Sequence, residues 1–282
     1  MKRSVAIIAA LVLAIGASAA EAKQASGVVP IRAGTPVTIA PDKAYILFRT
    51  IRFKSGEFSV QPVFLRVPAE QELAEYRAAK QAAFDKDLPK LMKHYEASNG
   101  KEPRPDIEDY GFTDKAHTNV FTVSGGAAYE DMPDQRTFLL EVPVGKYVLY
   151  GLGIGTAAVG TCFCLGTVSF QAEPGIVTDM GTVLVAKASD PSGEPELRDV
   201  TGLGKSINFG YYLFSAAVRP ATSATAAPGG VPADRRRPAD YQAVGPFLQP
   251  GAIHVNRLGA VPGVLRYDAG KVVDVKSGLV LE

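Results

Sequence analysis

Two cysteines separated by one residue, in Cys162-Phe163-Cys164, are the side chains of this sequence best suited to chemistry. Residues two apart in a regular strand share a face, but their Cβ atoms lie farther apart than the roughly 3.8 Å of a disulfide, so a local bond needs a bend. Gly160 and Gly166 could supply that bend. The alternatives are a reduced buried pair, a bond to another chain, or two soft ligands for a metal such as Cu(I). Cys162 and Cys164 are therefore a disulfide candidate and, lacking an evident third ligand, a weaker metal or redox candidate.

The remaining reactive residue types form no catalytic set. The three histidines, His94, His117 and His254, show neither His-x-x-x-His nor Glu-x-x-His spacing, and no Gly-x-Ser-x-Gly nucleophile elbow is present. Carboxylates gather between residues 106 and 114, but the order of ligands typical of a Ca²⁺ loop is missing, which favours a solvated loop. The sequence thus favours a protein without enzymatic activity and without a metal in this loop.

Two glycine motifs resemble nucleotide-binding loops. Gly153-Ile-Gly155-Thr-Ala-Ala158 follows an expected strand and Glu173 lies twenty residues after Gly153, as in a dinucleotide fingerprint, but no helix-forming run follows. Gly204-Lys205-Ser206 resembles the end of a phosphate-binding loop, although Asp199 occupies the position of the earlier glycine. No cofactor is expected, and the first motif is interpreted as a bend or bulge in a strand.

The first 22 residues have the features of a secretory signal peptide. Lys2 and Arg3 precede an apolar run from Val5 to Gly16, and Ala20-Glu21-Ala22 forms a small-x-small cleavage site. The run is shorter than the roughly 20 residues of a membrane-spanning helix, so no transmembrane segment is expected after cleavage. We therefore expect a periplasmic or secreted protein.

The balance of charge argues against nucleic acid as a partner. The chain has 30 Lys and Arg against 29 Asp and Glu, and removal of Lys2, Arg3 and Glu21 leaves 28 of each. Binding to nucleic acid depends on clustered basic residues. An envelope protein or a surface polymer is a partner more compatible with this composition.

Short apolar runs separated by turn residues predict a mainly β, α+β protein with an antiparallel sandwich. Strands are expected from 36 to 40, 44 to 53 and 58 to 67, with the last two joined as neighbouring antiparallel strands through a turn at 54 to 57. Turn residues then separate the later strands. These are expected at 118–124, 136–142, 146–152, 166–172, 178–185 and 206–216.

Residues 69 to 98 have the pattern of an amphipathic helix inserted between strands. Asn99-Gly100 suits its end, and Pro89 is expected to kink or split it. The stripe could face a partner or a membrane, but we expect it to pack as core against the sheet. Its apolar residues recur at three- and four-residue steps. They are Leu73, Tyr76, Ala79, Ala83, Phe84, Leu88, Leu91, Met92 and Tyr95.

The C-terminal third changes composition twice. Residues 219 to 252 are rich in Pro and Gly and carry Arg235-Arg-Arg237, which predicts an irregular linker that trypsin would cut first. Residues 253 to 282 regain apolar character, and a hairpin across Asp268-Ala-Gly270 is expected to dock on the main domain. The expected organisation is a signal peptide at 1–22, a sandwich domain at 28–218, the linker and the hairpin.

Part of this pattern resembles a known family. The Pro143-x-Gly145-x-Tyr147 cadence after Phe138 and the Pro174-Gly175 turn before Gly181 are similar to transthyretin-like and carboxypeptidase-regulatory-like sandwich domains, and to exported bacterial domains of unknown function. The resemblance covers about 50 residues and implies a small β-sandwich with a structural or interaction role. We therefore expect an exported, non-enzymatic module of the cell envelope, and as the alternative a metal-binding or redox protein that uses Cys162 and Cys164.

Overall fold

The computed structural model describes residues 27–51, 60–113, 119–154, 158–187, 193–197, 214–247 and 254–282. The signal-peptide region, the turn at 54–57, His117 and the Gly204-Lys205-Ser206 motif lie outside these ranges. The described chain is mainly β with one α-helix, which confirms the expected fold class. Residues 67–119 form one compact unit, and the rest of the described chain forms the other.

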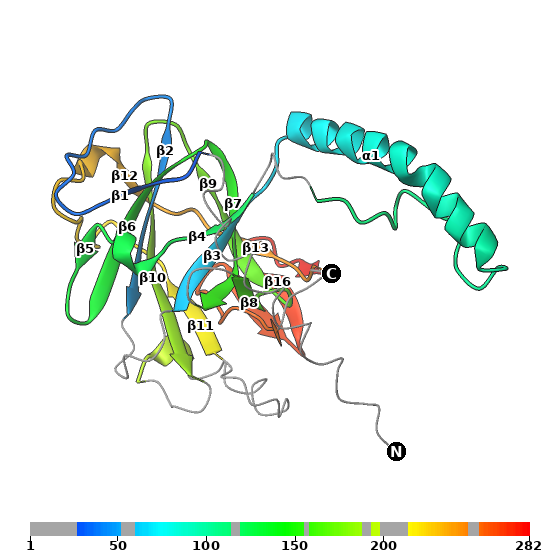
Figure 1. Ribbon diagram of the computed structural model, residues 1–282. Coiled ribbons are helices and arrows are strands. Elements are labelled where there is room, and N and C mark those ends of the chain that lie inside the picture. The colour runs from blue at the N-terminus through cyan, green and yellow to red at the C-terminus, as the bar shows by residue number, and fades with distance from the viewer. Residues whose placement is uncertain are drawn as a thin grey trace, which may run out of the picture. The chain divides into compact units, whose positions relative to one another are not determined.

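The larger unit contains two main sheets that enclose a common apolar core (Figure 1). The first sheet has the path β1-β6-β2-β10-β11, with β5 beside β6 and β12 beside β10. Its strands are β1 (Val29–Ile31), β2 (Ala44–Ile51), β5 (Glu130–Asp131), β6 (Gln135–Val142), β10 (Val177–Lys187), β11 (Phe214–Arg219) and β12 (Arg236–Pro238).

The second sheet has the path β13-β9-β7-β3-β4, with β8 beside β7 and β14 beside β8. A third, small sheet at the C-terminus follows the order β15-β16-β17. The strands of the second sheet are β3 (Val60–Arg66), β4 (Val120–Thr122), β7 (Gly145–Ile154), β8 (Ala158–Cys162), β9 (Thr167–Ala172), β13 (Gln242–Val244) and β14 (His254–Val255). Those of the third are β15 (Leu265–Asp268), β16 (Lys271–Asp274) and β17 (Val280–Leu281).

Large rings fill the space between the two main sheets. Phe48 of β2 lies 5.3 Å, centroid to centroid, from Phe64 of β3, which belongs to the opposite sheet. Phe48 also stacks on Phe138 of the neighbouring β6, with 4.9 Å between ring centroids. Because all three rings are fully buried, the inward faces of β2, β3 and β6 are held together by the hydrophobic effect.

Two of the expected strand relationships are wrong. β2 and β3 are not neighbours, because β2 pairs with β6 and β3 pairs with β7, in different sheets. Residues 36–40 form no strand, although Val37 and Ile39 pack on a second buried cluster over the outer face of β2. β2 is apolar on both faces because both of its faces are covered by other parts of the chain. The alternation of apolar and polar residues therefore could not indicate which strand pairs with it.

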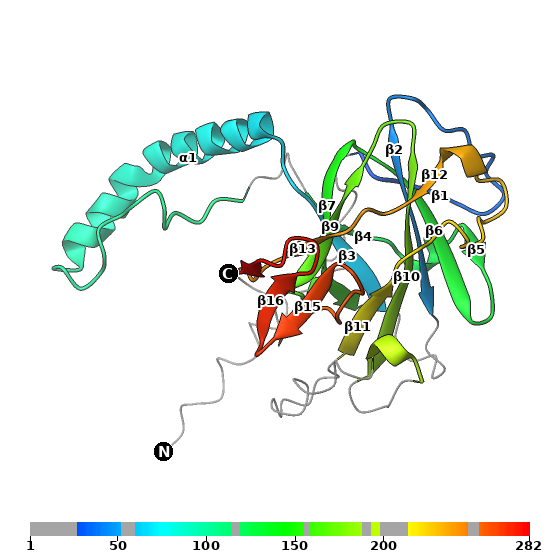
Figure 2. The same cartoon turned by 180° about the vertical axis from the view of Figure 1, so that it is seen from behind.

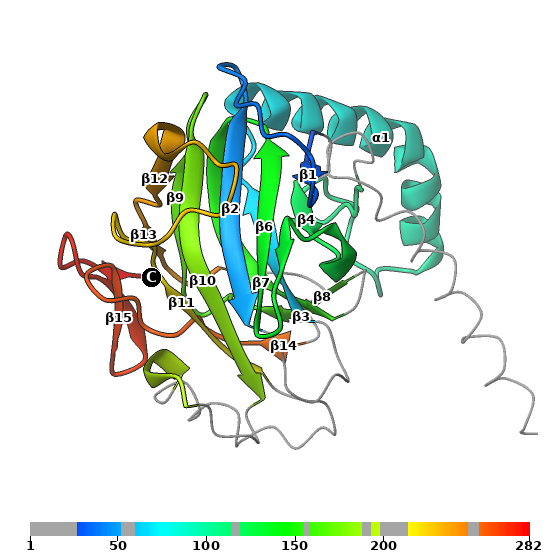
Figure 3. The ribbon, with the colours of Figure 1, turned by 90° about the vertical axis from the view of Figure 1, so that its left-hand side faces the viewer.

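The first sheet is also not purely antiparallel. β10 pairs in parallel with β2 on one side, and in parallel with β12 beside it (Figure 3). β9 and β10 are joined by the turn at Glu173-Pro-Gly175, where Gly175 has a φ of 69°. That turn passes the chain from the second sheet to the first, so consecutive strands do not pair with each other.

The segment expected to be an irregular linker is part of the fold, so the expected domain limit at residue 218 is wrong. Residues 236–238 form β12 on the first sheet, and residues 242–244 form β13 on the second. Figure 2 shows this orange segment crossing from one sheet to the other. Val231, from the Pro-rich part, is buried against Tyr45 and Leu139 on the outer face of the first sheet.

The expected C-terminal hairpin is present and docks on the larger unit. β15 pairs with β16 across Ala269-Gly270, and β17 adds a third strand. Leu265 and Val272 are buried in the main core cluster. The hydroxyl of Tyr267 donates to the carbonyl of Leu258 at 2.7 Å, and the Arg257 guanidinium lies 4.3 Å from the centre of the same ring. A hairpin too small to be stable alone is thus held by burial and by these polar contacts.

The smaller unit consists of helix α1 (Glu70–Ala97) and a returning segment. The helix is continuous through Pro89, so the expected split does not occur, and its axis bends along its length (Figure 1). Within this unit, Phe84 is the buried residue of the helix. Phe84 meets Tyr110 edge-on, and Tyr76 lies against Phe112, so the aromatic partners come from the returning segment.

The insertion point explains how a sandwich can carry this unit. β3 ends at Arg66, β4 begins at Val120, and Leu65 is the register partner of Val120. The two strands that flank the insertion are therefore already antiparallel neighbours. A tight turn could join them directly.

We predict that replacing residues 67–118 with Asn-Gly leaves the larger unit folded. The β3–β4 pairing stays intact and a two-residue loop suits an antiparallel hairpin, so the free energy of unfolding should change by less than about 2 kcal/mol. Urea unfolding followed by near-ultraviolet circular dichroism measures this change. Loss of the cooperative transition would show that the insertion is required for the larger unit to fold.

Candidate functional site

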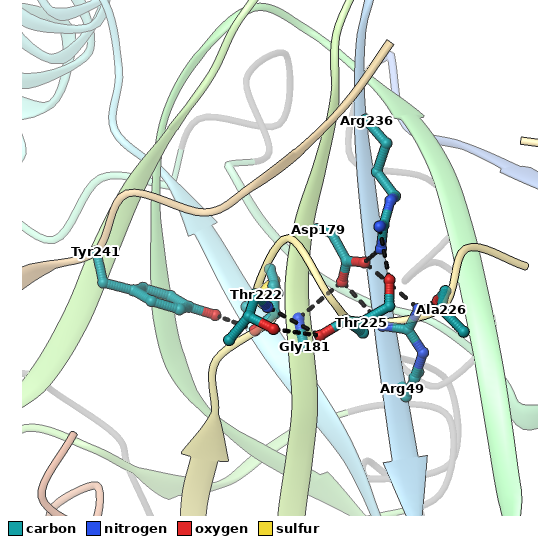
Figure 4. Close-up of polar contacts among 9 residues, drawn as sticks. Arg49, Asp179, Gly181, Thr222, Thr225, Ala226, Arg236 and Tyr241 are labelled. Atoms are coloured by element: carbon teal, nitrogen blue, oxygen red, sulfur yellow. Dashed lines mark hydrogen bonds and ion pairs between the residues drawn. The ribbon is translucent and has the colours of Figure 1, made fainter. Parts of the chain in front are cut away.

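The larger unit contains a buried ion cluster formed by Arg49, Asp179 and Arg236 (Figure 4). Arg49 Nη1 lies 2.9 Å from Asp179 Oδ1, and Arg236 Nη1 lies 2.8 Å from Asp179 Oδ2. The carboxylate is fully buried, while the two guanidinium side chains are 8 % and 10 % exposed. The carboxylate thus accepts charged hydrogen bonds from two strands, with Arg49 of β2 on both oxygens and Arg236 of β12 on Oδ2.

A bulge in β10 turns the Asp179 side chain toward its partners. The pairing of β10 with β2 shifts register between Asp179 and Thr182, and the backbone N–H of Gly181 donates to Asp179 Oδ1 at 2.9 Å. Gly181 has a φ of +85°, and a Cβ there would lie 2.1 Å from the carbonyl oxygen of Arg219. Only glycine fits both the backbone angle and this close approach to β11.

The cluster holds the Pro-rich segment in place. Arg49 Nη2 donates to the carbonyl of Ala226 at 2.9 Å, and Arg236 Nη2 donates to the carbonyl of Thr225 at 2.6 Å. Two positively charged guanidiniums share one carboxylate, so one N–H group of each guanidinium donates to these carbonyl oxygens instead. The cluster is therefore a clamp that ties residues 225–236 to β2 and β10.

Tyr241 anchors the chain at the start of β13, where it reaches the second sheet. Its side chain is fully buried and its hydroxyl donates to the carbonyl of Met180 at 2.7 Å. Burial first, and then the Asp179 charge, raises the pKa of the Tyr241 phenol well above its usual value. The phenol stays protonated at neutral pH and keeps its donor role.

Residues 236–244, which we call the crossover segment, run from β12 to β13 and form one wall of a groove. The groove has a volume of about 200 Å³. Its other wall comes from β7, β9 and the beginning of β10. The lining residues are Lys146, Phe170, Gln171, Glu173, Ile176, Thr178, Arg237, Pro238, Asp240 and Gln242.

Most charges at this groove are paired with an opposite charge. Arg237 Nη1 lies 3.6 Å from Glu173 Oε2, with both side chains more than half exposed. Lys146 Nζ donates to Gln242 Oε1 at 3.3 Å, and Asp240 is paired with Lys276. With Lys276 at its rim the groove has two ion pairs and one further lysine, Lys146, so it offers donors and acceptors without a strong cluster of either sign.

The structure brings Cys162 and Cys164 together at the bend that the sequence suggested. Their Cα atoms lie 5.2 Å apart, which is within the range that a disulfide spans. Both residues are buried. The carbonyl of Cys162 accepts from the N–H of Asn256, and that of Cys164 accepts from the N–H of Phe247. The pair therefore holds a bend to which two later segments are hydrogen-bonded.

The histidines do not join the cysteines. His94 is exposed on helix α1, where Nε2 lies 3.4 Å from Glu102 Oε2. β14 sets His254 opposite Thr161 in register, while Val255 is the residue opposite Cys162. Within the described ranges, no three His, Cys, Asp or Glu side chains gather as a metal site. The described residues also include no helix of the length and apolar character that would cross a membrane.

The described part of the glycine motif lies in strands, with Gly153 in β7 and Ala158 in β8, and residues 155–157 lie outside the described ranges. β7 and β8 pair antiparallel, and their register shifts between Leu152 and Gly153, which is a bulge. β8 begins at Ala158, where a nucleotide-binding fold would need a helix.

Sequence reasoning missed both the ion cluster and the groove. Asp179 lies in an apolar run and Gly181 follows two residues later, and this Asp-x-Gly in a strand is the signal that could have indicated a bulge. Arg236 was interpreted as an exposed linker residue because its neighbours are Arg and Pro. Its ion-pair partner, Asp179, lies 57 residues earlier, so no pattern in the sequence around Arg236 indicates the pairing.

Comparisons with protein-family models, curated proteins and solved structures found no match for this chain.

We predict that Asp179→Asn lowers the free energy of unfolding by about 3–5 kcal/mol, because it leaves two buried guanidiniums without a carboxylate. The matched control is Asp268→Asn, which removes an ion pair with Arg266 whose side chains are 71 % and 54 % exposed, and should cost less than about 1 kcal/mol. Urea unfolding of the three proteins measures both values. Equal losses in the two variants would contradict the clamp.

The same clamp revises the expectation for trypsin. Residues 235–237 should resist cleavage in the wild-type chain, because β12 and the Arg236 side chain are held on β10. In Asp179→Asn we expect faster cleavage after these arginines, which mass spectrometry of a limited digest detects. A wild-type chain cut first at 235–237 would restore the linker interpretation.

Proposed function

We propose that this chain is an exported, non-enzymatic binding module of the cell envelope, located in the periplasm or secreted. The single observation that carries the proposal is the groove beside the crossover segment, a preformed recess lined by exposed polar side chains. The buried polar groups nearby, Asp179, Arg49, Arg236 and Tyr241, all bond to one another or to the backbone. They hold the walls of the recess, and the exposed groups offer contacts to a partner.

The features of the first 22 residues support export, and the mainly β fold is compatible with a binding module. The partner in this proposal is an envelope protein or a surface polymer, and neither nucleic acid nor a cofactor has a part in it. In this proposal Cys162 and Cys164 form a structural disulfide, which an oxidising compartment permits. A metal-binding or redox role for the pair is the alternative, and the alternative lacks a third ligand within the described ranges.

Cell fractionation tests the export step. We expect the chain, expressed in a bacterium, in the periplasmic or secreted fraction, with a mature N-terminus at Lys23 by mass spectrometry. The matched control is a chain lacking residues 2–22, which should stay in the cytoplasm. An uncleaved N-terminus with retention in the cytoplasm would overturn export.

Co-sedimentation tests the binding step. Purified mature protein is mixed with an insoluble envelope fraction, and the pelleted share is measured with and without prior protease treatment of that fraction. Retention in either case supports a binding module, and the protease arm separates a protein partner from a polymer. Protein that stays in the supernatant with both fractions would overturn the proposal.

The redox state of the cysteines gives a further prediction. We expect no free thiol per wild-type chain when the protein is denatured without reductant. The double substitution Cys162→Ser, Cys164→Ser should cost more than about 2 kcal/mol of stability, because both side chains are buried and each new hydroxyl needs a hydrogen-bond partner. Urea unfolding compares it with the Cys162→Ala, Cys164→Ala variant, which removes the bond without adding hydroxyls. Two free thiols, with one metal ion per chain by elemental analysis, would favour the metal-binding alternative.

A further inference from the structure

The groove beside the crossover segment has the chemistry of a site for an uncharged, hydroxyl-rich ligand. Its charges are largely paired, because Arg237 lies beside Glu173 and Asp240 beside Lys276, while Lys146 donates to the amide oxygen of Gln242. A phosphate-bearing or strongly acidic ligand would need a cluster of unpaired positive charge, and a single lysine, Lys146, does not form such a cluster. The partner that this charge balance fits is therefore neutral and polar.

The polar side chains of the groove are of the types that bind neighbouring hydroxyl groups. Gln171, Gln242 and Arg237 carry flat groups with two or more hydrogen-bonding atoms, and the carboxylates add acceptors in pairs. A sugar ring presents vicinal hydroxyls, each of which both donates and accepts. Its C–H groups also form an apolar surface, and Ile176 and Pro238 offer an apolar counterpart in the same groove.

The groove is built on paired strands. Gln171 lies in β9 opposite Lys146 of β7, and Gln242 lies in β13 opposite Ser169 of β9. The opposite wall is fixed because Arg236 bonds to Asp179 and the N–H of Ala239 donates to the Asp179 carbonyl at 2.8 Å. Binding would therefore require little ordering of the backbone, which reduces its entropic cost.

We infer that this groove binds a neutral saccharide unit of an envelope polymer. The inference rests on the proposed function and narrows it, because it selects the polymer over the envelope protein as the partner. Gln171 and Gln242 supply hydrogen bonds to ring hydroxyls, the Arg237–Glu173 pair lies at one side, and Ile176 and Pro238 contact the C–H surface.

The test is a glycan array that carries neutral and anionic oligosaccharides, probed with labelled full mature protein. We expect binding to a subset of neutral glycans, weakened about tenfold or more in Gln171→Ala, Gln242→Ala, because two direct hydrogen-bond partners are lost. The matched control is Gln71→Ala, Gln81→Ala, which changes two exposed glutamines of helix α1 and should bind as wild type. Thermal unfolding confirms that each variant is folded.

A second groove variant, Arg237→Gln, tests the groove if the double variant fails to fold. The Arg237 side chain is 64 % exposed, so this substitution should leave the fold intact. It should also weaken binding to the neutral glycans. Binding that is confined to anionic glycans, or equal in groove and control variants, would overturn the inference. A silent array with protease-sensitive retention by the envelope fraction would overturn the saccharide while the binding module stands, and a silent array without any retention would overturn both.

Discussion

One carboxylate, that of Asp179, organises the larger unit. It accepts charged hydrogen bonds from Arg49 on one side and Arg236 on the other, and a backbone bond from Gly181 fixes its orientation. Through the two guanidiniums it also positions the carbonyls of residues 225 and 226. Because an unpaired charge is costly in a buried place, the chain is stable here only when all these groups are assembled together.

The groove is a consequence of this clamp. β12 pairs with β10 where Arg236 reaches Asp179, and from there the chain crosses to the second sheet to form β13. Buried Tyr241 anchors the crossing from the inside, while Arg237 and Gln242 stay on the surface. Buried polar groups hold the walls, and exposed groups of the same segment are placed to meet a ligand.

Most elements of the fold could be predicted from the sequence, because each leaves a local pattern. The three-and-four spacing around Phe84 indicated helix α1, and Asp268-Ala-Gly270 indicated the terminal hairpin. Pairing could not be predicted, since β2 is apolar on both faces and gives no sign that its partners are β6 and β10. The candidate site depends on that pairing, so of its parts only the Cys162–Cys164 bend was evident beforehand, and the groove residues were indistinguishable from ordinary surface.

The sequence separation within the clamp has a consequence for how the chain folds. Arg49 and Asp179 are 130 residues apart, and Arg236 follows 57 residues after Asp179. Contacts between such distant positions form slowly, because a long loop must close before any stabilising bond is made. During synthesis, which proceeds from the N-terminus, β2 and β10 are both made before β12. During that interval Asp179 lacks its second arginine, so in folding intermediates the part of the outer face of β2 around Arg49 should stay open to solvent or to a chaperone until residue 236 arrives.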